Sequence, residues 1–242
     1  MSENRSFLSR RRLLGVCGLS LFTAGAPMGG VAAAAGRRTA GRAREPQRYV
    51  HAGPKALALT IDDGPDPVWT PQVLSLLSRY GVPATFFLIG SRAEAHPDVV
   101  RRIVAGGHLL GNHTWSHPDL GELPAARVRE EMERTGEVIA RTTGEQPPEL
   151  FRAPGGNFTH EALAVCDELG LWPVSWSVDP QDWARPGTDR IVERVLAQTR
   201  SGSIILNHDG GGDRSQTVAA LRIYLPRLMA AGYWFTVPGP RG

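Results

Sequence analysis

The feature that most constrains the fold is a regular alternation of short apolar runs with longer amphipathic stretches. Seven apolar runs have the length and composition of buried β-strands: residues 55–61, 84–89, 108–111, 149–152, 172–177, 203–207 and 233–237. Helical periodicity covers the intervening residues 70–80, 97–105, 124–143, 159–169, 188–199 and 215–231. Strands that alternate with helices form parallel sheets. We therefore expect an α/β fold, namely a compact, distorted or incomplete (β/α) barrel of about seven strand–helix units. An open doubly wound sheet is the alternative, although the chain has no glycine-rich phosphate loop.

The first 35 residues have the pattern of an export signal rather than of a folded element. Arg10, Arg11 and Arg12 precede a weakly apolar stretch that ends in the small residues 32–35. This arrangement is typical of a bacterial twin-arginine signal peptide, so residues 1–35 predict a secreted protein, extracellular or in the cell wall. A membrane anchor is less favoured, because glycine and proline interrupt the apolar stretch. After removal of the signal we expect no membrane span.

Residues 36–50 are rich in arginine and glycine and are interpreted as a flexible linker before a catalytic domain over residues 51–242. The formal net charge of the chain is +3, but residues 1–48 hold nine arginines against two glutamates, which leaves −4 for residues 49–242. Nucleic-acid binding therefore loses its main support. Cys166 would be the one cysteine left after cleavage, so no internal disulfide is expected. We expect the domain to be a monomer.

Polar residues that are unusual in a buried sheet follow the predicted strands at their C-terminal ends. They are Asp62 and Asp63 after the first strand, His113 and His117 after the third, Arg152 after the fourth, Asp179 and Asp182 after the fifth, and His208 after the sixth. The carboxyl ends of the strands in a β/α barrel meet on one face, where active sites are built. We therefore expect these side chains to gather in one site.

The adjacent carboxylates Asp62 and Asp63 are the strongest indication of chemistry. Two neighbouring carboxylates at the end of a buried strand repel each other and lose solvation, so they require a positive charge nearby. The Asp-Gly-Pro sequence alone would equally suit an ordinary turn. His113 and His117, however, have the four-residue spacing that places two imidazoles on one side of a turn, and Pro118 favours a loop there. Two histidines and one carboxylate form the ligand set of a catalytic metal site, so one aspartate is expected to bind metal and its neighbour to act as a base.

Five motifs occur in order within about residues 54–237: Thr60-Ile61-Asp62-Asp63-Gly64-Pro65, His113-Thr114-Trp115-Ser116-His117-Pro118, Arg152-Ala153-Pro154-Gly155-Gly156, Asp179-Pro180-Gln181-Asp182-Trp183 and Leu206-Asn207-His208. With these motifs the chain resembles polysaccharide deacetylases of the NodB-homology type, the fourth family of carbohydrate esterases. Each motif alone is a weak signal, whereas five in the same order make a chance agreement very improbable.

The resemblance implies which residues hold the metal and which handle the proton. Asp63, His113 and His117 would be the ligands of a divalent ion, with zinc expected and cobalt, nickel or manganese as alternatives. Asp62 would be the general base, oriented by Arg152. The ion would activate a water molecule for attack on the acetyl group.

The resemblance also implies the groups that complete the reaction. His208 would be the general acid, with Asp182 as the first choice and Asp179 as the second choice for its carboxylate partner. The backbone N–H of Gly155 would stabilise the oxyanion, and the acetyl pocket would be lined by Trp183 and Leu206. Gly155 stands where many members have an aromatic residue, which leaves the sugar preference open.

The sequence therefore predicts a secreted, metal-dependent hydrolase that removes acetyl groups from a polysaccharide or oligosaccharide. Members of the family act on N-acetylglucosamine units of peptidoglycan or chitooligosaccharides, which is the expected reaction, and on O-acetylated xylan, which is the alternative. A non-catalytic carbohydrate-binding relative and an Fe(II) oxygenase with the same ligand types are the competing classes. The oxygenase is disfavoured because such enzymes usually have antiparallel β-barrels.

Overall fold

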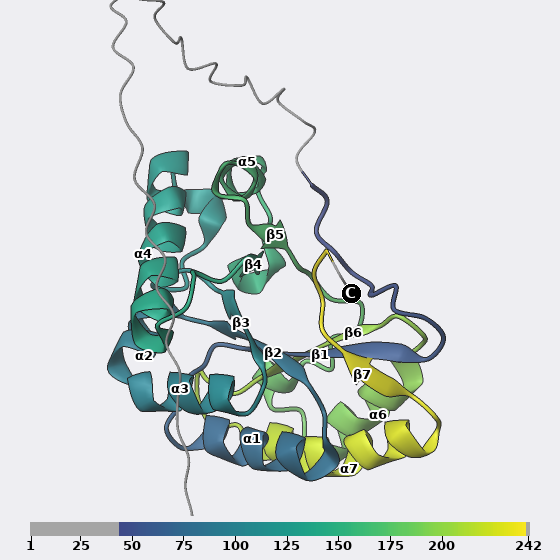
Figure 1. The fold of residues 1–242 in the computed structure, drawn as a ribbon. Coiled ribbons are helices and arrows are strands. Elements are labelled where there is room, and N and C mark those ends of the chain that lie inside the picture. The colour runs from purple at the N-terminus through teal and green to yellow at the C-terminus, as the bar shows by residue number, and fades with distance from the viewer. Residues whose placement is uncertain (1–43, 241–242) are drawn as a thin grey trace, which may run out of the picture. The chain divides into compact units, whose positions relative to one another are not determined.

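The computed structural model of the protein describes residues 44–240. The signal peptide predicted over residues 1–35, and residues 36–43 of the predicted linker, lie outside the described residues. The described part of the chain forms one compact unit of strands and helices (Figure 1).

Seven parallel strands form a single curved sheet at the centre of the domain (Figure 1). Their order is β5-β4-β3-β2-β1-β6, and β7 pairs with the first residues of β1. The strands are β1 Ala56–Asp62, β2 Ala84–Leu88, β3 Leu109–Asn112, β4 Leu150–Phe151, β5 Trp172–Pro173, β6 Ile204–His208 and β7 Trp234–Thr236. Every residue of β1 is buried, because the strand lies mid-sheet with apolar side chains on both faces.

The two ends of this sheet approach each other through the segment that follows β5. Val178 forms a parallel bridge with Ile205 of β6, although it lies outside any named strand. Leu206 donates its backbone N–H to the carbonyl of Val178 at 3.0 Å. The predicted distorted (β/α) barrel is therefore confirmed, and the open doubly wound alternative is not what the chain forms. The strand predicted over residues 172–177 is shorter than expected, because after Pro173 the chain turns from β4 towards β6.

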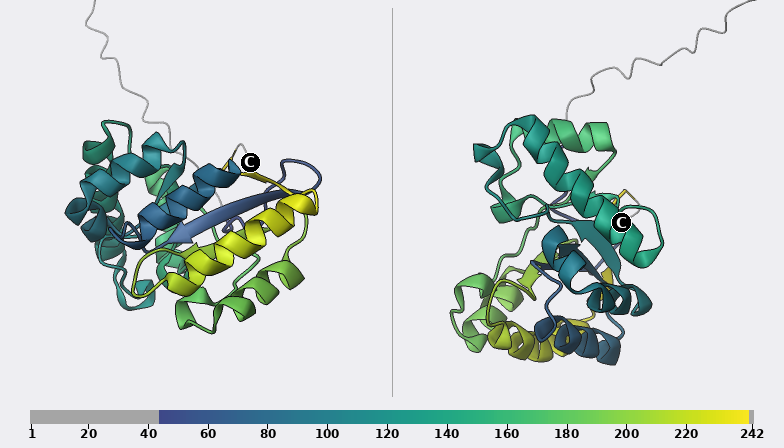
Figure 2. Two further views of the ribbon diagram at one scale, coloured as in Figure 1. Left: turned by 90° about the horizontal axis from the view of Figure 1, so that it is seen from below. Right: turned by 90° about the vertical axis from the view of Figure 1, so that its left-hand side faces the viewer.

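Helices cover the outside of the sheet, as Figure 2 shows. They are α1 Trp69–Tyr80, α2 Gly90–Ala95, α3 Pro97–Ala105, α4 Ala125–Thr143, α5 His160–Leu169, α6 Thr188–Gln198 and α7 Ser215–Ala230. The short helix α2 and three single-turn 3₁₀ helices were not predicted, since six residues or fewer carry too little periodicity. Apolar faces of the long helices and the strands make the main core. No helix among residues 44–240 is both long and apolar enough to cross a membrane.

The N-terminal boundary of the domain lies before residue 51. Gln47 forms a parallel bridge with Val174, and Tyr49 forms an antiparallel bridge with Ser203. Val50 is buried and donates its backbone N–H to the carbonyl of Gly202 at 2.8 Å. The last residues of the predicted flexible linker are therefore part of the domain, because they satisfy backbone groups at the edges of the sheet.

Candidate active site

The pairing of β1 with β6 brings two of the predicted site residues next to each other. Asp62, the last residue of β1, is paired in register with His208, the last residue of β6. Paired residues on neighbouring parallel strands point to the same face of the sheet, so the carboxylate and the imidazole lie on one side of it, at the carboxyl end of the barrel. The structure thus brings together the residues that follow the first and sixth strands, as predicted.

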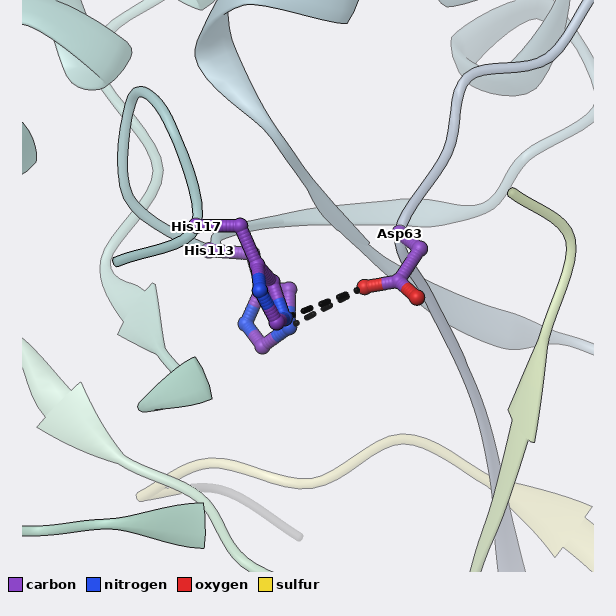
Figure 3. A group of neighbouring side chains, drawn as sticks. All are labelled: Asp63, His113 and His117. Carbon is purple, nitrogen blue, oxygen red and sulfur yellow. Dashed lines mark ion pairs between the residues drawn. The ribbon is translucent and has the colours of Figure 1, made fainter. Parts of the chain in front are cut away.

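The loop after β3 brings both histidines of the second motif to Asp63. The Oδ1 atom of Asp63 lies 3.5 Å from Nε2 of His113 and 3.4 Å from Nε2 of His117. Figure 3 shows the carboxylate pointing at the two rings. Ligand atoms around a four-coordinate ion with bonds of about 2.0–2.2 Å stand roughly 3.3–3.6 Å apart, so this spacing fits a metal centre.

The protonation of Asp63 and His117 also suits a cation. Burial alone would raise the pKa of Asp63, but the nearby His113 and the charges of His208 and His117 hold it well below its usual range. Burial and the nearby His113 lower the pKa of His117, so its ring is neutral at neutral pH. Oδ1 of Asp63 is buried and has no hydrogen-bond partner among the described residues. A buried oxygen without a partner is costly, and a bound ion would satisfy it.

His113 is oriented by the backbone of the third motif. Its Nδ1 lies 2.7 Å from the carbonyl oxygen of Arg152, which fixes the tautomer with the proton on Nδ1 and leaves Nε2 free as a ligand. Metal-binding histidines are commonly held in this way.

Several residues of the site have left-handed backbone conformations that side chains rarely adopt. Asp63 has φ 72°, Thr114 has φ 67° and His117 has φ 60°. Non-glycine residues in this region cost free energy and are kept where the surrounding structure holds them for a function.

Glu131 of α4 holds the histidine loop in this conformation. Its Oε2 accepts the backbone N–H groups of Trp115 and Ser116, both at 2.8 Å, and its Oε1 accepts the Ser116 hydroxyl at 3.0 Å. The sequence analysis missed Glu131. The available signal was an acidic residue on the apolar face of a helix, three residues after the buried Val128 and directly before the buried Met132.

Arg152 fixes the general-base candidate. Its side chain is fully buried, and Nη1 donates to Oδ1 of Asp62 at 2.7 Å and to the hydroxyl of Thr60 at 2.8 Å. Nε donates to the carbonyl of Val174 at 3.1 Å and Nη2 to that of Ser175 at 2.9 Å. Oδ1 of Asp62 is thereby engaged, while Oδ2 lies 3.8 Å from Nε2 of His113, one of the three candidate metal ligands.

Asp182 is the carboxylate partner of His208. Its Oδ1 lies 2.7 Å from Nδ1 of His208, and its Oδ2 accepts the His208 backbone N–H at 2.9 Å and the Thr217 hydroxyl at 2.8 Å. Burial alone would lower the pKa of His208, but the hydrogen bond and charge of Asp182, with the charges of Asp62 and Asp63, raise it to about 9. Thr217, on α7, was not predicted, because nothing in the sequence links it to Asp182.

Asp179, the second choice for that role, is engaged elsewhere. Its Oδ1 accepts the backbone N–H of Gln181 at 2.7 Å, which closes the turn where Gln181 has φ 56°. The short side chain of an aspartate favours such turns. The ambiguity between the two carboxylates of the fourth motif is thus resolved in favour of Asp182.

The remaining predicted site residues differ in exposure. Trp183 is 53% exposed beside Asp182, whereas Leu206 is 3% exposed and lies inside β6. Gly155 is exposed with φ 59°, and a Cβ there would meet no atom within 4 Å. The surface next to Gly155 is therefore open.

Known proteins match this arrangement in sequence and in fold. A chitooligosaccharide deacetylase of Bradyrhizobium sp. is 45% identical over 192 residues, which cover 75% of this chain and 88% of that protein. A peptidoglycan-N-acetylglucosamine deacetylase of Bacillus cereus is 43% identical over 183 residues, covering 75% of this chain and 85% of that protein. A crystal structure of a peptidoglycan N-acetylglucosamine deacetylase in complex with 4-naphthalen-1-yl-N-oxidanyl-benzamide superposes with a TM-score of 0.76 at 36% identity, covering 79% of this chain and 89% of that one. The family model described as polysaccharide deacetylase matches residues 50–174, and the chain belongs to the polysaccharide deacetylase family.

Proposed function

We propose that the protein is a metal-dependent hydrolase that removes acetyl groups from N-acetylglucosamine units of peptidoglycan or chitooligosaccharides. One observation carries the proposal: a carboxylate held by Arg152 and a histidine held by Asp182 end two paired strands beside the cluster of Asp63, His113 and His117. The relatives named as deacetylases of these two substrates support the same reading.

Asp63, His113 and His117 would hold the divalent ion, with zinc expected from the nitrogen and oxygen donors. When bound, such an ion supplies a Lewis acid that polarises the acetyl carbonyl and makes water a better nucleophile at neutral pH. Asp62 takes the proton of the attacking water on Oδ2, because Oδ1 is occupied by Arg152. The bond from Arg152 also fixes the orientation of that carboxylate.

His208 supplies the proton that the leaving group needs. Hydrolysis of an N-acetyl group expels an amine, which leaves readily only when it is protonated. With Nδ1 bonded to Asp182 and a pKa of about 9, His208 carries its proton at neutral pH and offers it from Nε2. Gly155 is an exposed residue, and its backbone N–H is the proposed donor to the oxyanion, a contact typically worth about 3 kcal/mol in other enzymes.

Removal of O-acetyl groups from xylan is the alternative, because ester and amide hydrolysis use the same parts. The paired His208 favours the amide, since an alkoxide leaving group depends less on a preprotonated acid. A non-catalytic carbohydrate-binding protein would have no need of either Asp62 or His208, and both are present.

A panel of substrates tests the proposal. Metal-reconstituted protein is incubated with chitooligosaccharides, peptidoglycan and acetylxylan, and released acetate is measured with zinc, cobalt, nickel and manganese in turn. We expect acetate and new free amines from at least one of the first two substrates, and no release after treatment with a chelator. Release from acetylxylan alone would establish the esterase alternative, and no release from any of the three would refute the proposal.

We further propose that the enzyme acts outside the cytoplasm as a monomer, after export through the twin-arginine route. The motif of Arg10, Arg11 and Arg12 at the N-terminus supports the route. Replacing all three by lysine in the full chain should keep the protein in the cytoplasm, whereas export of that variant at the normal level would contradict the route. The molar mass of the exported protein in solution, measured by light scattering, tests whether it is a monomer.

A further inference from the structure

Asp209, directly after His208, is a fully buried carboxyl that the proposed reaction does not use. No arginine, lysine or histidine among residues 44–240 forms an ion pair with it. Its Oδ2 accepts the hydroxyl of Thr70 at 2.6 Å, and its Oδ1 has no hydrogen-bond partner among the described residues. A buried carboxyl without a cation lowers the stability of the fold. Stability alone therefore does not explain why an aspartate occupies position 209.

The neighbour of Asp209 is the turn that carries the base and the metal ligand. A Cβ atom at Gly64 would lie 2.3 Å from Oδ1 of Asp209, closer than any side chain could approach. Gly64 itself is outside the left-handed region, which in this turn is occupied by Asp63 at φ 72°. The glycine of the first motif is therefore explained by the close approach of Asp209 and not by its own backbone conformation.

Two further contacts tie Asp209 to the same turn. Its backbone N–H donates to the carbonyl of Asp62 at 3.1 Å, which extends the pairing of β1 with β6 by one residue. The Thr70 hydroxyl that it accepts also receives the backbone N–H of Asp66 at 2.8 Å. Asp209 thus joins the end of β6, the turn after β1 and the start of α1.

We propose that Asp209 is a positioning residue, which packs on Gly64 and anchors Thr70 so that the turn presents Asp63 to the metal and Asp62 to the substrate. Groups that orient ligands from behind typically change metal affinity or activity by 10- to 100-fold when removed. The predicted change in metal affinity depends only on the cluster of Asp63, His113 and His117. A predicted change in activity depends also on the proposed function.

Metal affinity of the full domain, measured by competition with a chromogenic chelator for Zn²⁺ and Co²⁺, tests the proposal. Asp209→Ala and Thr70→Val should each weaken affinity by about 10-fold or more, and the absorption spectrum of the Co²⁺ form should change. Asp98→Asn and Thr143→Val are the matched controls, since both lie on helices away from the site, and neither should change affinity. Thr70→Val removes only a hydroxyl and decides the question if Asp209→Ala does not fold. A lower melting temperature with affinity within twofold of wild type for Thr70→Val would overturn the proposal, because the network would then serve the fold alone.

A double substitution examines the contact with Gly64 directly. Gly64→Ala alone should weaken metal affinity, because its methyl group would collide with Oδ1 of Asp209. In the Asp209→Ala background the same change should cost far less, since the obstructing oxygen is gone. If the two losses simply multiply, Asp209 does not act through Gly64. These measurements need no substrate, so they can succeed even if no acetate is released, which would refute the proposed function and not this inference.

Discussion

Arg152 and Asp62 form an ion pair of 2.7 Å in which neither side chain is more than 3% exposed. Removal of one partner leaves the other charged, buried and unpaired, which typically costs 3–5 kcal/mol. Arg152→Met should therefore lower the free energy of unfolding by about that amount and reduce acetate release by more than 100-fold. Urea unfolding and acetate assays measure the two effects. Arg190→Met, which breaks an exposed pair with Glu193, should change stability by less than about 1 kcal/mol. Similar losses in the two variants would contradict the special role of the buried pair.

Substitutions of Asp62 and Asp63 should have different effects on metal binding. Asp62→Asn keeps the three metal ligands, so it should bind metal with near wild-type stoichiometry while losing most of its activity. Asp63→Ala removes the oxygen that faces both histidines and should lose metal and activity together. Elemental analysis of the dialysed proteins, with acetate release, measures both. Equal loss of metal in the two variants would show that the roles are wrongly assigned.

The pair of His208 and Asp182 should make stability depend on pH in the metal-free protein. The pKa of His208 is raised from 6.5 to about 9 in the folded state. The contribution of protonated His208 to the free energy of unfolding is therefore fully present below about pH 6.5 and is lost as the pH rises through about 9. A shift of this size corresponds to roughly 3 kcal/mol.

Urea unfolding at several pH values between about 6 and 10 measures this contribution. The difference in free energy of unfolding between wild type and Asp182→Asn should shrink over that interval, because the variant lacks the charge that favours protonated His208. Parallel pH curves for the two proteins would show that Asp182 does not raise the pKa of His208.

Glu131 should matter for the metal although it is not a ligand. Glu131→Gln weakens the acceptor of two backbone N–H groups in the histidine loop, so His117 should lose its fixed position. We expect zinc affinity to fall by about 10- to 100-fold. Chelator competition measures it, and Glu130→Gln, the exposed neighbour paired with Arg127, is the control. Unchanged affinity in Glu131→Gln would mean that the loop keeps its shape without this carboxylate.

The strands and long helices could be predicted because their patterns are local. Helix α3 occupies the predicted residues 97–105, and β1, with apolar residues on both faces, lies within one residue of its predicted bounds. Helix α2 was missed because six residues carry no clear period. The overlong prediction for β5 has another cause: Val174 still donates its backbone N–H to Phe151 of β4, but the chain then leaves β4, and Val178 pairs with Ile205 of β6.

The site, too, could be predicted only in part from the sequence. Residues at strand ends could be foreseen from the barrel rule, which placed Asp62, Asp63 and His208 on one face. Glu131 stood out as an acidic residue on an apolar helix face, but its partners and those of Asp209 could not be foreseen, because they lie on segments distant in the sequence. The choice between Asp179 and Asp182 depended on a turn of three residues, which a motif does not specify.

The register of β1 with β6 carries a consequence for how this enzyme could change. The separation of base and acid is set by backbone hydrogen bonds between neighbouring strands, at Asp62 and His208, and not by any loop. Gly155 and Trp183, which we propose lie next to the sugar, are instead exposed residues on turns. The side chains on those turns can change while the pairing of β1 with β6 stays the same. Substrate preference can therefore change in evolution while the spacing of the proposed base and acid is kept.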